Sequence, residues 1–94
     1  MKLFKLLKGI KCRVLGSMLV DIEGLYHDDK KVKNAGMFFC LTGLNFDGSD
    51  YVKSAIKNGA VAIVTEKEIF GLHGVTQILV KDARKMMSLI AKNF

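Results

Sequence analysis

The sequence contains no proline and no tryptophan, only two cysteines and two histidines, and no long uninterrupted apolar run. Because proline is absent and glycine occurs nine times, tight turns in a compact fold are favoured over a rigid linker. A membrane-spanning helix needs about 20 consecutive apolar residues, and small secreted domains usually carry a denser disulfide framework. We therefore predict that Cys12 and Cys40 are reduced thiols in a cytoplasmic protein.

The few metal-ligating and acidic side chains form no convincing chemical site. The histidines, His27 and His73, have no spacing to the two cysteines that matches a zinc site. Asp28 and Asp29 are adjacent, and neighbouring residues of an extended segment point in opposite directions. Nearby lysines neutralise both carboxylates, so a solvated charged loop is favoured over an acid–base pair or a magnesium site. We predict no metal site and no catalytic residues.

The composition is typical of a globular protein, because half of the 94 residues are hydrophobic and about a quarter are charged. The chain is basic, with a formal net charge of +6. Five positive charges precede the first acid, Asp21, and they are Lys2, Lys5, Lys8, Lys11 and Arg13. This segment leaves nucleic acid or an anionic membrane surface open as partners. Because no nucleic-acid motif accompanies it, a solvated basic face is preferred, and we predict neither partner.

The first third of the chain predicts a short helix over residues 2–8, because leucines and lysines lie on different sides of it at helical spacing. The lysines interrupt the apolar stretch that a secretory signal would need. A short strand is predicted over 10–15. Partial alternation predicts a half-buried strand over 18–25, and the polar stretch 26–34 is predicted to be a loop.

The middle of the chain predicts a strand–helix–strand unit. Residues 37–42 form a continuous apolar run between glycines, which is typical of a strand buried on both faces. A helix is predicted over 50–58 with Ser49 as its N-cap, and a second buried strand over 60–65. This order indicates a βαβ unit with parallel pairing and a right-handed crossover.

The last third predicts a connection over 66–75, a strand over 76–81 and a helix capped by Asp82. The fold class is therefore a small α/β domain with a mostly parallel sheet and flanking helices. Ligands of such sheets bind beyond the carboxyl ends of the strands. The loops 26–34 and 43–49 are predicted to leave strands at that edge, so a functional site is expected there.

The loop between Gly43 and Ser49 precedes a helix N-terminus, where free N–H groups and the helix dipole favour an anion. Its two glycines, Gly43 and Gly48, have the separation of a phosphate-binding P-loop, but the phosphate-gripping lysine is missing. Asp47 adds a negative charge. An ATP site is therefore excluded here, and by itself the loop is typical of a tight turn and a helix cap.

Four stretches of the sequence, residues 27–33, 36–43, 47–51 and 55–64, together resemble the Mur ligase family. Within that family, they resemble the N-terminal domain of the UDP-N-acetylmuramoyl-tripeptide synthetases. The similarity extends over essentially the whole chain. It implies that residues 1–94 form a single domain with the fold of a Mur ligase N-terminal domain.

The resemblance implies an activity for a longer parent protein. Such ligases add the third amino acid to UDP-N-acetylmuramoyl-L-alanyl-D-glutamate, using ATP and Mg²⁺ through an acyl phosphate. Their N-terminal domain holds the uridine nucleotide end, while central and C-terminal domains bind ATP and the incoming amino acid. Because this sequence has no Gly-Thr-Asn-Gly-Lys-Thr type of loop, the resemblance implies a substrate-binding fragment without a cofactor of its own, and not a complete enzyme.

The resemblance also implies which residues contact the nucleotide sugar. The family usually has Asp-Ser-Arg where this chain has Asp28, Asp29 and Lys30. The contact positions of this motif correspond to Asp29 and His27. A second set of contacts corresponds to Leu44, Asn45 and Phe46, and the possible supporting residues are Lys30, Gly43, Asp47, Gly48 and Ser49. Because a carboxylate replaces the serine, a domain that keeps the fold but has lost nucleotide affinity is the alternative.

Overall fold

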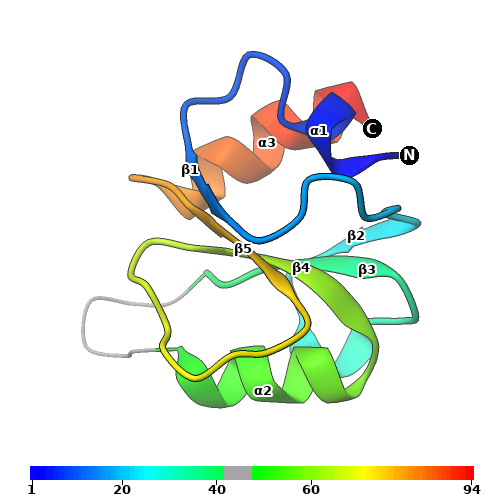
Figure 1. Cartoon of the computed structure of the whole chain (residues 1–94), viewed down its shortest axis with the longest axis vertical. Helices are drawn as coiled ribbons and strands as arrows, with labels where there is room; N and C mark the ends of the chain where they lie inside the picture. The colour runs from blue at the N-terminus through cyan, green and yellow to red at the C-terminus, as the bar shows by residue number, and fades with distance from the viewer. Residues whose placement is uncertain (42–47) are drawn as a thin grey trace.

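The computed structural model describes residues 1–41 and 48–94, and in this part of the chain five strands form one sheet (Figure 1). The strands are β1 (Arg13–Leu15), β2 (Gly24–Tyr26), β3 (Gly36–Phe39), β4 (Ala60–Thr65) and β5 (Thr76–Leu79). Their order across the sheet is β1-β5-β4-β3-β2. Only β1 runs antiparallel, at one edge beside β5, so the predicted mostly parallel sheet is confirmed.

Helices cover both faces of the sheet, as Figure 1 shows. α1 (Leu3–Leu6) and α3 (Ala83–Asn93) lie on one face, and α2 (Ser49–Lys57) lies on the other. A single 3₁₀ turn, η1 (Asp29–Lys31), follows β2 and contacts α2. The amide of Asn93 donates to the carbonyls of Leu6 and Lys8, at 2.8 and 3.0 Å, and so holds the end of α3 against α1.

β3 separates two hydrophobic layers because successive side chains of a strand point to opposite faces. Met37 and Phe39 join the layer under α1 and α3, whereas Phe38 and Cys40 join the layer under α2. All four side chains are buried, which confirms the prediction from the continuous apolar run. Cys12 packs against the first layer and Cys40 belongs to the second, so the two thiols lie on different faces and form no disulfide.

The predicted βαβ unit is confirmed, since β3, α2 and β4 follow one another and β3 pairs with β4 in parallel. Its helix starts differently from the prediction, because Gly48 and not Ser49 occupies the N-cap position. Gly48 has a φ of 75°, a left-handed conformation that glycine adopts without the steric cost of a Cβ. Ser49 is the first residue of α2, so its predicted N-cap position was wrong.

The strand predicted over 18–25 is much shorter in the structure, where only its end belongs to β2. The residues before β2 pair instead with the N-terminus: the Leu3 and Phe4 amides donate to the carbonyls of Val20 and Met18, at 2.9 and 3.0 Å. Periodicity alone could not distinguish this pairing from a strand of the sheet, because both have extended backbone.

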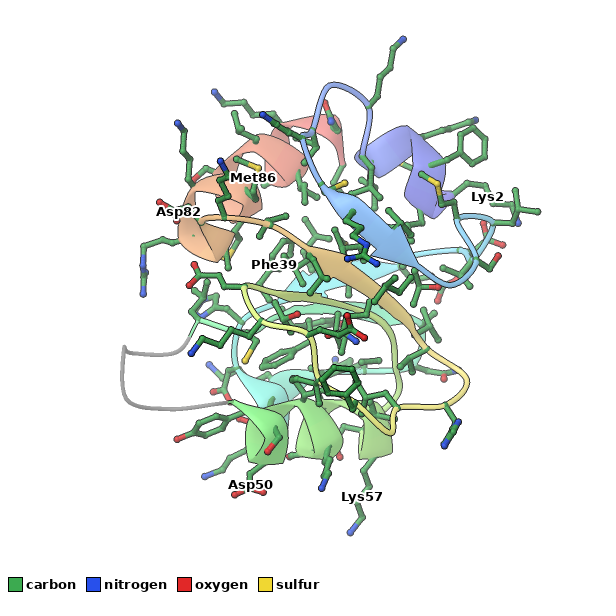
Figure 2. The ribbon with its side chains drawn as sticks, turned by 60° about the vertical axis from the view of Figure 1, so that its left-hand side comes forward. Lys2, Phe39, Asp50, Lys57, Asp82 and Met86 are labelled. Atoms are coloured by element: carbon green, nitrogen blue, oxygen red, sulfur yellow. The ribbon has the colours of Figure 1, made fainter. Side chains whose placement is uncertain are left out.

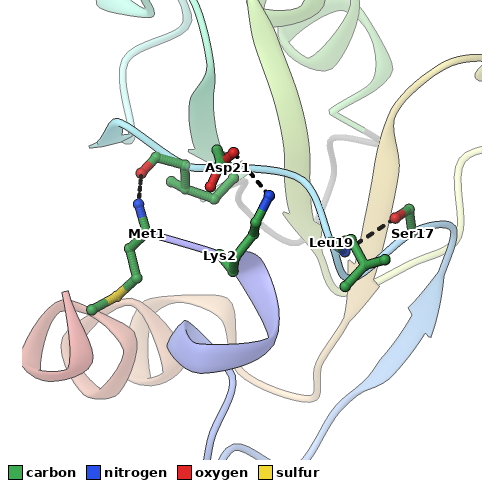
Figure 3. Close-up of polar contacts among 6 residues, drawn as sticks. Met1, Lys2, Ser17, Leu19 and Asp21 are labelled. Atoms are coloured by element: carbon green, nitrogen blue, oxygen red, sulfur yellow. Dashed lines mark hydrogen bonds and ion pairs between the residues drawn. The ribbon is translucent and has the colours of Figure 1, made fainter.

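Polar contacts also attach the N-terminus to the segment before β2 (Figure 3). The Met1 amino group donates to the Ile22 carbonyl at 3.1 Å, and the Lys2 ammonium lies 2.9 Å from the Asp21 carboxylate. The hydrogen bond from the Lys2 ammonium holds the pKa of the Asp21 carboxyl below its ordinary value. Because the folded-state pKa is lowered, the contact favours the folded chain at neutral pH and ceases to do so as the pH falls through that pKa.

A buried glutamine, Gln77 in β5, holds the connection between β4 and β5 against the sheet. Its Oε1 atom accepts from the Thr65 hydroxyl at 3.1 Å and from the Ile69 amide at 2.8 Å, and its Nε2 donates to the Ile69 carbonyl at 3.1 Å. Ile69 packs with the layer under α2. This connection thus covers a part of the sheet without forming a helix.

Replacing Gln77 by leucine is expected to lower the free energy of unfolding by about 2 kcal/mol, because three polar groups lose their partner away from water. Thr65→Val removes only one of these hydrogen bonds and should cost about half as much. Urea unfolding measures both losses, and hydrogen exchange should show a deprotected Ile69 amide in the Gln77→Leu variant. Unchanged protection of that amide would contradict the assigned role of Gln77.

Candidate functional site

The carboxyl ends of β2, β3, β4 and β5 meet at one edge of the sheet because these four strands are parallel. The segment that starts at His27 follows β2, and the segment that ends at Gly48 follows the neighbouring β3. The Cys40 thiol, just after β3, donates to the Gly48 carbonyl at 3.8 Å. The described parts of the two predicted loops therefore begin or end at the same edge, as the sequence predicted.

Five of the predicted contact and supporting residues, Gly43, Leu44, Asn45, Phe46 and Asp47, lie outside the described residues. The remaining ones are His27, Asp29, Lys30, Gly48 and Ser49. His27 and Lys30 are exposed, whereas Asp29 and Ser49 are partly buried and Gly48 is buried.

A small cavity of about 210 Å³ lies directly after β2, and its lining residues are Leu25, Tyr26, His27, Asp28 and Lys31. The ring of Tyr26 lies against the backbone of Gly24 and Gly36, where an added Cβ would come within 2.9 Å of the ring. The residues that line the cavity thus include a tyrosine, a histidine, an aspartate and a lysine. Ligand pockets usually exceed about 300 Å³, so this one fits a single ring and not a whole nucleotide.

Of the predicted residues, only His27 lines this cavity, whereas Tyr26, Asp28 and Lys31 were missed. Asp28 is the N-cap of η1, and its carboxylate accepts the Lys30 amide at 3.0 Å. An aspartate whose carboxylate accepts an amide two residues later is a common turn. The aspartate at position 28 could therefore have predicted a turn in the sequence. Such a turn brings Lys31 to the same cavity as His27.

Asp29 lies further from the second loop than the sequence suggested. Its carbonyl accepts the amide of Asn58 at 3.0 Å, and Asn58 directly follows the C-terminal end of α2. Gly48 precedes the other end of the same helix. Nine helical residues span about 13 Å. A ligand that contacts both Asp29 and the loop before α2 must therefore be extended along the helix.

The charges of the segment after β2 are only partly balanced, with two aspartates against three lysines in residues 28–33. Within the part of the chain that the structure describes, the one ion pair is that of Lys2 and Asp21. Neither Lys30 nor Lys31 therefore forms a close ion pair with Asp29. The neutralisation that the sequence suggested for Asp29 does not take place through direct contact.

The N-terminus of α3 lies at the same edge, but carboxylates already occupy it. The Glu66 carboxylate accepts the Ala83 amide at 2.8 Å, and the Asp82 carboxylate accepts the Lys85 amide at 3.0 Å. Asp82 is the predicted N-cap, whereas the long-range contact of Glu66 had no sequence signal. With Leu41 and Arg84, these two acids line a cavity of about 300 Å³. Like charges disfavour a phosphate there. The start of α2 is the other helix N-terminus at this edge, and its first turn carries a single acid, Asp50.

Residues 1–41 and 48–94 contain no cluster of three or more side chains that could hold a metal ion. No helix in these two ranges is long and apolar enough to cross a membrane. The described geometry defines a class of protein: an α/β domain whose parallel strands bring two connections, after β2 and before α2, to one edge of the sheet. Comparisons with known proteins specify the family.

The family described as "Mur ligase family, catalytic domain" matches residues 21–94, and the chain belongs to this family. The chain is 48% identical, over 94 residues, to the UDP-N-acetylmuramoyl-L-alanyl-D-glutamate--2,6-diaminopimelate ligase of Caldanaerobacter subterraneus subsp. tengcongensis. It is 40% identical, over 95 residues, to the ligase of the same name from Alkaliphilus metalliredigens. Both alignments include all of this chain but only 20% and 19% of those ligases.

A crystal structure of MurF from Acinetobacter baumannii has the same fold. It superposes with a TM-score of 0.78 at 18% identity, and covers 98% of this chain and 20% of that chain. The predicted fold class, an α/β sheet like that of a Mur ligase N-terminal domain, is thereby confirmed. The chain spans about one fifth of the length of the curated relatives that it matches.

Proposed function

We propose that this chain holds the uridine diphosphate end of UDP-N-acetylmuramoyl-L-alanyl-D-glutamate for a ligase of peptidoglycan synthesis. The observation that carries the proposal is the shared edge of the sheet, where the cavity after β2 and the start of α2 lie on neighbouring connections. The cavity fits one heterocyclic ring, and the N–H groups and the dipole at the start of α2 favour phosphate oxygens. An extended nucleotide can bridge the two.

The relatives support a specific parent reaction. Those from Caldanaerobacter and Alkaliphilus are named for 2,6-diaminopimelate as the added amino acid. We infer the same third residue for a parent ligase of this chain, which would act in the cytoplasm. Its ATP would be bound by a central P-loop domain, and a C-terminal domain would help to bind the incoming amino acid. The present sequence itself has no P-loop lysine.

Titration of the ¹⁵N-labelled chain with UDP-N-acetylmuramoyl-L-alanyl-D-glutamate tests the proposal. Amide shifts are expected at residues 26–31 and at Gly48 and Ser49, with little change in β1 or α3. ATP is the control ligand, because it shares the ribose and phosphates but lacks the uracil and the amino sugar. An absence of shifts at millimolar ligand, or equal shifts with ATP, would refute the proposed recognition.

A second candidate, a domain that keeps the fold but binds the nucleotide poorly, is favoured by Asp29. This carboxylate stands where the family usually has serine and has no close ion-pair partner in the described residues. It is predicted to repel the diphosphate. The two candidates predict different affinities for the unmodified chain, weak for this one and tight for a competent binding domain.

Asp29→Ser is expected to raise the affinity for the nucleotide sugar about threefold. Two phosphate charges at the start of α2, about 13 Å away in water, oppose one carboxylate by roughly 0.6 kcal/mol. Calorimetry or the same amide titration measures the change. Glu23→Ser is the matched control, because it removes an equal charge at the amino end of β2, away from the site. Equal gains from both variants would show a general charge effect and no role for Asp29.

A further inference from the structure

A larger cavity, of about 680 Å³, lies at the corner of the sheet formed by β1, β5 and α3. Three short stretches line it: residues 11–13 leading into β1, residues 79–82 at the end of β5, and residues 85–86 in α3. Figure 2 shows Asp82 just before α3 and Met86 in the N-terminal part of that helix. Because β1 and β2 are opposite edges of the sheet, this cavity is separate from the candidate nucleotide site.

The wall of the cavity is apolar, since Cys12, Leu79, Val80 and Met86 line it. Burial raises the pKa of the Cys12 thiol, so this group stays neutral at physiological pH. The usual small-molecule pocket measures about 300–1,000 Å³. The cavity therefore has the size and lining of a site for the apolar part of a small molecule.

The lining charges are mostly positive, with four cations against one carboxylate. The cations are Lys11, Arg13, Lys81 and Lys85. Asp82 is the single acid, and its carboxylate already accepts the Lys85 amide at 3.0 Å. None of the four cations has a carboxylate within ion-pair distance in residues 1–41 and 48–94. An anionic group at the rim would thus meet uncompensated positive charge.

We propose that this cavity binds a small amphipathic anion, an acyl chain that ends in a carboxylate. The chain would occupy the apolar wall beside Cys12 and Met86, and the carboxylate would lie among the rim cations. Apolar burial supplies the affinity, and the charges select an anion over a neutral or cationic molecule of the same shape. Nothing in this proposal depends on the binding of a nucleotide sugar at the other end of the sheet.

Three probes with the same ten-carbon tail test the proposal: decanoate, decanol and decyltrimethylammonium, each below its micelle concentration. The readout is the alkylation rate of Cys12 by N-ethylmaleimide, followed by mass spectrometry, with the buried Cys40 as an internal reference for unfolding. Saturating decanoate is expected to slow Cys12 alkylation at least about fivefold, since the bound chain excludes the reagent from the cavity wall. Amide shifts at residues 79–86 should accompany the protection.

The double variant Lys81→Gln/Lys85→Gln is expected to weaken decanoate binding about tenfold and decanol binding hardly at all. Its matched control is Lys53→Gln/Lys57→Gln, which removes two exposed charges from α2 on the other face and should leave both affinities unchanged. Equal protection by decanoate and decanol, or no protection by any probe, overturns the proposal. Because no probe contains a nucleotide, either failure leaves the nucleotide-sugar titration unaffected.

Discussion

Replacing Phe39 by alanine is expected to lower the free energy of unfolding by about 3–5 kcal/mol, the usual cost of truncating a buried phenylalanine. Phe39 is fully buried in β3 and belongs to the layer under α1 and α3. Small domains have a total stability of only about 5–15 kcal/mol. Urea unfolding followed by circular dichroism should therefore show a large fall in the midpoint, and the variant should be partly unfolded without denaturant.

Phe70→Ala is the control for this prediction, because the same side chain is 81% exposed at that position. Its removal should change the free energy of unfolding by less than about 0.5 kcal/mol. Similar losses in the two variants would contradict the placement of Phe39 in the core. The result also concerns function, because β3 lies directly before the second predicted loop and next to β2 in the sheet.

Replacing Gly59 by alanine is expected to cost about 3 kcal/mol from two separate causes. Gly59 has a φ of 120°, which strains any residue with a Cβ by about 1–3 kcal/mol. The added Cβ would also lie 2.7 Å from the Cα and 2.9 Å from the backbone nitrogen of Asn34. Backbone atoms can move away only with a shift of the chain, so overpacking adds about 1–3 kcal/mol. Chemical denaturation measures the sum.

Gly71→Ala separates the two causes. Gly71 also has a positive φ, 81°, but an added Cβ there would meet nothing within 4 Å. This variant should lose only about 1–2 kcal/mol, from the backbone conformation alone. If both variants lost the same free energy, the close approach of Gly59 to Asn34 would have no energetic role. Because Asn34 ends the segment that starts at His27, Gly59→Ala should also weaken the response of residues 26–31 to the nucleotide sugar.

Much of the fold was predictable because local patterns determine secondary structure when tertiary contacts agree with them. The apolar run 37–42 overlaps the buried strand β3, which begins one residue earlier and ends at Phe39. The amphipathic stretch 50–58 corresponds to α2 with a shift of one residue. Asp82 was predicted as the N-cap of α3 and occupies that position. The strand predicted over 18–25 was too long because a tertiary contact overrides the local pattern there. The extended backbone before β2 pairs with the N-terminus, a partner that no local pattern specifies.

The candidate site was predictable only as far as its edge of the sheet. Parallel strands imply that the connections after β2 and before α2 meet there, and the structure agrees for the described residues. The partners of individual side chains were not predictable. Asp29 lies beside Asn58, 29 residues away, and Tyr26 and Lys31 join His27 around one cavity. Such contacts depend on how separate elements pack, which periodicity does not encode.

The sequence by itself determined the order of the elements, the βαβ unit and the resemblance to the Mur ligases, because these depend on residue type and spacing along the chain. Only the tertiary structure decided that β1 joins the sheet antiparallel, that Glu66 occupies the start of α3, and that residues 11–13, 79–82 and 85–86 line one open cavity. The physical reason is that burial and charge act between atoms that are close in space, whatever their separation in sequence.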